Sequence, residues 1–74
     1  MSDNLFFEGQ DNISAIYLPT ENGCINTNGE NEKIIVSMEY GQMAGVPWFC
    51  YYKDGVLVSK WNAAYIEGVT FIKA

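Results

Sequence analysis

Residues 46–61 read VPWFCYYKDGVLVSKW, two apolar runs separated by a polar turn. The dipeptide Asp54-Gly55 favours a two-residue type I′ turn, because both positions of that turn need a positive φ angle. Apolar and aromatic runs on either side of such a dipeptide are typical of paired strands. The stretch therefore predicts a β-hairpin with Asp54-Gly55 at its tip.

The register that follows from this turn places large side chains on both faces of the hairpin. Counting outward, Tyr52 lies opposite Leu57 and Trp48 lies opposite Trp61. One face is then expected to carry Trp48, Cys50, Tyr52, Leu57 and Trp61. The other face is expected to carry Phe49, Tyr51, Val58 and the aliphatic stem of Lys60. A hairpin that is apolar on both faces is either covered on both sides by its own chain or leaves one face for a partner.

Further strands are expected on either side of the hairpin. Residues 13–18 and 69–73 are rich in residues that favour strands, and residues 33–40 alternate in the manner of a half-buried strand. Between the hairpin and the last strand, residues 62–67 predict at most one short helical turn, with Asn62 as its N-cap.

These elements predict an all-β fold in a single domain spanning residues 1–74. The order of strand, long loop, strand, hairpin, helical turn and strand is that of a five-stranded SH3-like barrel. A small antiparallel sheet that dimerises through one face is the alternative. Residues 19–32 are expected to form a long polar loop that is functional or hides a short strand, and residues 1–9 to form a flexible arm.

The charge balance limits the kinds of partner. The chain carries nine carboxylates against four lysines, with no arginine and no histidine, for a net charge of −5. Nucleic-acid binding draws most of its affinity from clustered Lys and Arg, and anionic membrane surfaces attract the same residues. We therefore expect neither direct nucleic-acid binding nor membrane association. In the absence of a secretory signal, Cys24 and Cys50 are expected to be free thiols in a cytoplasmic protein.

Catalysis is not expected. Without histidine the chain lacks the usual proton shuttle at neutral pH and the commonest metal ligand. Two cysteines alone do not form a tetrahedral zinc site, and the spacing of Glu30 and Glu32 matches no calcium loop. No cofactor-binding motif is present, so we expect no enzyme activity, no metal and no cofactor.

The surplus of aromatic residues indicates binding instead, because Tyr and Trp are enriched at interaction hot spots. The candidate interaction residues are Trp48, Phe49, Tyr51, Val58, Trp61 and Tyr65. Most aromatic residues of so short a chain are expected to fill its core, and the surplus on the second hairpin face is what favours an interface. The sequence thus predicts a small, self-associating protein-interaction module that inhibits or adapts another protein. In size, acidity and aromatic content the chain is similar in character to bacteriophage proteins that disable host enzymes or defence systems.

Two other functions stay open at this stage. The first is a small-ligand binder that sequesters a nucleotide signal in pockets between subunits, although the chain lacks the arginines that usually bind phosphate. The second is mimicry of nucleic acid by carboxylates, which the thin spread of acidic residues disfavours.

Overall fold

The computed structural model describes residues 6–19, 23–41 and 45–72. These residues form an antiparallel sheet and one short 3-10 turn, η2, at Ala63–Tyr65. The strands are β1 Ile13–Tyr17, β2 Cys24–Asn26, β3 Glu32–Tyr40, β4 Gly45–Lys53, β5 Val56–Asn62 and β6 Gly68–Phe71. Within these residues, no helix has the length and apolar character needed to cross a membrane.

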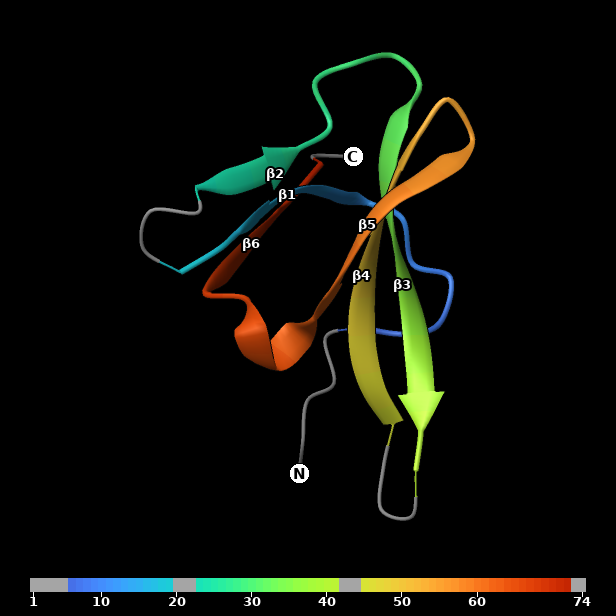
Figure 1. Cartoon of the computed structure of the whole chain (residues 1–74), viewed down its shortest axis with the longest axis vertical. Coiled ribbons are helices and arrows are strands. Elements are labelled where there is room, and N and C mark those ends of the chain that lie inside the picture. The colour runs from blue at the N-terminus through green and yellow to red at the C-terminus, as the bar shows by residue number, and fades with distance from the viewer. Residues whose placement is uncertain (1–5, 20–22, 42–44, 73–74) are drawn as a thin grey trace.

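The sheet curls into an open barrel. Strands β3, β4 and β5 form a meander, while β1 pairs with β6 and β2, and with β3 through Ile13 and Ile34. Figure 1 shows the two groups of strands, β1, β2 and β6 on one side and β3, β4 and β5 on the other. Because the first strand pairs with the last, the sheet folds back on itself instead of remaining flat. The predicted all-β fold is confirmed.

The hairpin turn is the one that the sequence predicts. Asp54 has φ 54° and Gly55 has φ 78°, as a type I′ turn requires. The two pairs nearest the turn, Lys53 with Val56 and Tyr52 with Leu57, also follow the predicted register.

Beyond those two pairs the predicted register is wrong. Tyr51 lies opposite Ser59, so Val58 is an extra residue in β5 and forms a β-bulge. The bulge displaces every later pair by one position: Trp61 lies opposite Phe49, whereas Trp48 lies opposite Asn62. The predicted Trp48–Trp61 pair does not form. Simple counting fails here because the bulge turns Trp61 towards the core.

The same bulge reverses the predicted place of Lys60. Lys60 pairs with Cys50 and its Nζ lies 5.1 Å from the centre of the Trp48 ring, on the face opposite Phe49. A regular strand would have directed the ammonium group towards the core, where a charge is costly. The bulge therefore directs Trp61 towards the apolar interior and Lys60 towards solvent.

The core lies on the concave side of the curled sheet. Its fully buried side chains are Ile13, Ile16, Ile34, Val36 and Phe49. Ile34 and Val36 belong to the alternating face expected for residues 33–40, whereas Tyr40 at the end of that face is exposed. Phe49 is the largest of the buried side chains and is contributed by the strand between β3 and β5.

The described part of the predicted arm is packed against the barrel. The Phe6 ring meets Phe49 edge-on at 5.0 Å between ring centres. Gly9 N donates to Val36 O, and Val36 N donates to Gln10 O, both at 2.8 Å. Residues 6–9 of the predicted arm therefore lie against the barrel, and Gly9 and Gln10 hydrogen-bond with the backbone of Val36 in β3. Residues 1–5 lie outside the described residues.

The stretch expected to be a long polar loop, residues 19–32, contains a short strand. Cys24–Asn26 form β2, in which Ile25 lies opposite Ile16 of β1. A hidden strand is one of the two expectations for this stretch, and its pairing with β1 satisfies the backbone of Cys24–Asn26. The expected turn at 62–67 is confirmed as η2, where Asn62 Oδ1 accepts a hydrogen bond from Ala64 N at 2.8 Å.

Candidate functional site

The six residues proposed for interaction do not form one surface. Phe49 is only 1% exposed and belongs to the core, so it cannot contact a partner directly. Tyr51 is partly buried against the core cluster. Trp48 is partly buried on the opposite face of β4, and Val58 lies exposed at the bulge. Of the six, the structure brings together Trp61 and Tyr65.

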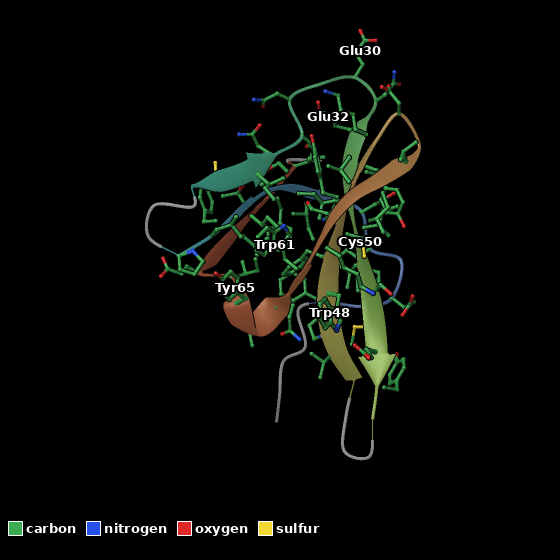
Figure 2. All side chains as sticks on the ribbon, viewed as in Figure 1. Glu30, Glu32, Trp48, Cys50, Trp61 and Tyr65 are labelled. Atoms are coloured by element: carbon green, nitrogen blue, oxygen red, sulfur yellow. The ribbon has the colours of Figure 1, made fainter. Side chains whose placement is uncertain are left out.

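Trp61 and Tyr65 stack on each other at the junction of β5 and η2. Their ring centres are 5.5 Å apart and the rings are nearly parallel, at 11°. Figure 2 shows the two side chains next to each other, Trp61 on β5 and Tyr65 on η2. Trp61 is partly buried against the core, whereas Tyr65 is 47% exposed. The pair thus has one ring anchored in the fold and one presented to solvent.

Local structure holds this aromatic pair in place. The indole N–H of Trp61 donates to Ser59 Oγ at 3.3 Å. The Asn62 cap starts η2 directly after Trp61, and Ile66 N closes the turn on Ala63 O at 3.0 Å. These contacts fix the indole on which Tyr65 stacks and the turn that carries Tyr65, which lowers the entropic cost of ordering Tyr65 on binding.

Tyr17, which sequence reasoning did not single out, lies at the same end of the molecule. It pairs with Gly68 at the start of β6, and Tyr17 O accepts a hydrogen bond from Glu67 N at 2.8 Å. Its side chain is 40% exposed, whereas Ile16 beside it is fully buried. Simple alternation would not have found it, because β1 has a register shift after Ile13, and the neighbours Ala15 and Ile16 are both buried.

A second apolar surface lies on β5. Val56, Leu57 and Val58, here called the β5 strip, are 65%, 47% and 57% exposed. Strand β5 ends the path of paired strands, so in the described part of the chain its outer edge has no partner strand. Only Val58 of this strip was predicted as an interaction residue. Val56 and Leu57 were not predicted as interaction residues, although both keep the partners that the predicted register gave them.

Cys50 lies on the same face as Trp48 and is buried. Burial raises the pKa of the Cys50 thiol; nearby Lys60 lowers it and Glu8 raises it, and the net shift is upward. Burial also raises the pKa of the Tyr51 hydroxyl, helped by a hydrogen bond with Glu32. Both shifts favour the neutral form of the group.

The two thiols are expected to differ in reactivity. Because Cys24 is exposed while Cys50 is buried with a raised pKa, Cys50 should react at least about tenfold more slowly with a thiol reagent at pH 8. Timed alkylation with mass spectrometry, using Cys24→Ser and Cys50→Ser variants, measures each rate. In denaturant the two rates should become equal. Equal rates in the native protein would contradict the burial of Cys50.

Two of the hollows on the surface of the described residues differ in size and lining. The larger, of about 600 Å³, is an open depression between the loop before β3 and the hairpin tip, lined by Glu30, Glu32 and Asp54 among others. A smaller one of about 190 Å³ lies between Phe6, Phe49 and the residues that follow η2. Within residues 6–19, 23–41 and 45–72, no three metal-ligating side chains gather closely enough to hold an ion.

Comparison with protein-family models, with curated proteins and with solved structures found no match to this chain. The functional interpretation therefore depends on the geometry of its own residues.

Proposed function

We propose that this protein is a non-catalytic binding protein, a self-associating interaction module that inhibits or adapts a host protein in the cytoplasm. The observation that carries the proposal is the stacked pair of Trp61 and half-exposed Tyr65 at the end of the open barrel. Bacteriophage proteins that disable host enzymes or defence systems have this general character, and we place the protein among such factors as part of the proposal.

The exposure of the Tyr65 ring has a cost in stability. An aromatic ring left half in water forgoes much of the stabilisation that burial would provide. A tyrosine that is already stacked on an anchored tryptophan offers a partner a large contact area with few rotamers to lose. Such preorganised aromatic residues are the ones that dominate binding energy when a partner buries them.

Sequestration of a nucleotide signal is the less well supported alternative. The larger hollow is lined by the carboxylates of Glu30, Glu32 and Asp54, with Lys33 as its cation. Phosphate groups would be repelled by three carboxylates at close range. Mass spectrometry of small molecules released by heating the purified protein tests this alternative directly.

Replacing Tyr65 is expected to abolish capture of the protein partner. Tyr65→Ala should weaken binding by at least about 30-fold, the effect of losing a hot-spot aromatic residue. The matched control is Tyr40→Ala, because Tyr40 is 71% exposed at the far end of β3. Immobilised wild-type and variant proteins are incubated with host lysate, and recovered proteins are quantified by mass spectrometry.

A stoichiometric protein that wild type and Tyr40→Ala retain, and that Tyr65→Ala loses, would support the proposal. Recovery of no stoichiometric protein, or equal recovery by all three, would count against it.

A further inference from the structure

The edge of β5 carries features that specify what can pair with it. The β5 strip places three consecutive exposed apolar side chains on a terminal strand. Long apolar edges of this kind readily pair with another strand. The proposed function includes self-association, and the inference below depends on that part of it.

Hairpin geometry identifies which backbone groups face outward. A two-residue turn is closed by a hydrogen-bonded pair, here Lys53 with Val56, and such pairs alternate with non-hydrogen-bonded ones. Leu57, opposite Tyr52, therefore occupies a non-hydrogen-bonded position. Its N–H and C=O point away from β4, towards the open edge. The next position of the same kind is Lys60, opposite Cys50.

We infer that two copies of this protein pair through β5 in antiparallel orientation, about a twofold axis at Leu57. Leu57 N–H of each copy donates to Leu57 C=O of the other, which satisfies both outward groups with the same residue. Val56 of one copy lies opposite Val58 of the second copy. The β5 strip is thus covered by an identical strip.

The charges around the strip complement each other in this arrangement. In the register of β4, Lys60 lies two positions beyond Leu57 despite the bulge. In the other direction β5 begins at Val56, directly after the turn residues Asp54 and Gly55. Lys60 of one copy therefore faces the turn of the second copy, which carries Asp54. The twofold axis forms this Lys60–Asp54 pair twice. A parallel arrangement would place Lys60 beside Lys60 instead.

The bulge at Val58 keeps the pairing short. Bulges on edge strands twist the backbone and limit how far a foreign strand can extend the ladder. A twofold dimer uses the same edge of both copies, so it closes instead of growing into a fibre. Because the strip is smaller than the surface that a tight dimer buries, the Kd should lie between about 10 µM and 1 mM.

Sedimentation equilibrium between about 10 µM and 1 mM measures this association for the wild type and four variants. Leu57→Lys should weaken dimerisation at least about tenfold, because it puts two ammonium groups at the axis. Val46→Lys is the control, since it makes the same change in net charge at a valine that is 41% exposed on β4, outside the residues paired with β5. Its dimerisation should match the wild type.

The charge pair is tested separately. Lys60→Glu should weaken dimerisation about fivefold or more, because it replaces the ammonium group beside Asp54 of the second copy with a carboxylate. Adding Asp54→Asn should restore most of the loss, because asparagine keeps the turn that needs positive φ and removes the repulsion. Near-ultraviolet circular dichroism checks that each variant is folded.

The pairing is established if Leu57→Lys weakens dimerisation and if adding Asp54→Asn to Lys60→Glu restores it. The proposed pairing would be overturned if the wild type is monomeric at all concentrations, or if Leu57→Lys leaves the Kd of the dimer unchanged. Capture of a protein through Tyr65 would stand in either case, because that residue lies outside the β5 strip. Failure of that capture alongside an intact dimer would instead refute binding through Tyr65.

Discussion

Deletion of Val58 is expected to leave the protein folded, at a cost of no more than about 2 kcal/mol in the free energy of unfolding. Val58 is the extra residue of the bulge, since Leu57 lies opposite Tyr52 and Ser59 opposite Tyr51. Its removal produces a regular ladder in which every later residue of β5 keeps its observed partner. Trp61 would still lie opposite Phe49 and stack on Tyr65.

Deletion of both Val58 and Ser59 should have the opposite result. The bulge contains one extra residue, so removal of two residues shifts every later pair of β5 by one position. Asn62 then lies opposite Phe49, and Trp61 points to the outer face. Loss of a tryptophan from the core and entry of an amide should together cost at least about 4 kcal/mol. For a domain of this size that lowers the melting temperature by about 20 °C or more.

Thermal and urea unfolding of the wild type and both deletion variants measures these costs. Trp61 fluorescence reports whether the indole stays in its apolar environment, with Trp48→Phe as the common background. If the strand had no bulge, Trp61 would lie opposite Trp48 on the outer face, and the single deletion would move every later residue of β5 to the opposite face of the sheet. A severe loss of stability from the single deletion would therefore contradict the observed register.

Replacement of Phe49 by alanine is expected to cost about 3–5 kcal/mol. Phe49 is 1% exposed, packs edge-on against Phe6 and lies opposite Trp61, so its removal leaves a cavity between three parts of the chain. Small domains have a total stability of only about 5–15 kcal/mol, and short chains lie at the low end. Most of the protein should unfold below body temperature.

Urea unfolding of Phe49→Ala measures the loss, and Tyr40→Ala serves as its control. Tyr40 is 71% exposed, so its truncation should change stability by no more than about 1 kcal/mol. Similar losses in the two variants would mean that Phe49 does not organise the core. If Phe49→Ala instead melts at the wild-type temperature but no longer captures the partner, Phe49 would be an interaction residue after all.

Much of the secondary structure follows from local sequence. Asp54-Gly55 determines the hairpin turn because few other residues adopt two successive positive φ angles without strain. The alternation from Ile34 to Met38 identifies the buried face of β3, since neighbouring strand residues point to opposite sides. Asn62 marks the start of η2, because its side chain can accept a hydrogen bond from the backbone two residues later.

The candidate site was only partly predictable. Trp61 and Tyr65 were chosen as aromatic residues, but their stacking depends on a bulge that nothing in the sequence around Val58 indicates. Phe49 was chosen for the same reason and proved to be core, because composition cannot tell a buried ring from an exposed one. Tyr17 was missed because β1 does not alternate regularly: Ala15 and Ile16 are both buried, so their positions do not mark Tyr17 as outward-facing.

The sequence by itself determined that this protein is an antiparallel all-β domain with a tight hairpin at Asp54-Gly55 and a capped turn at Asn62. Those features depend on the φ angles and hydrogen bonds of a few adjacent residues. Only the tertiary structure decided which face of the hairpin becomes core. One extra residue at Val58 reverses the side on which Trp61 and Lys60 lie, and the fold includes it because that register buries the indole and leaves the ammonium group in water.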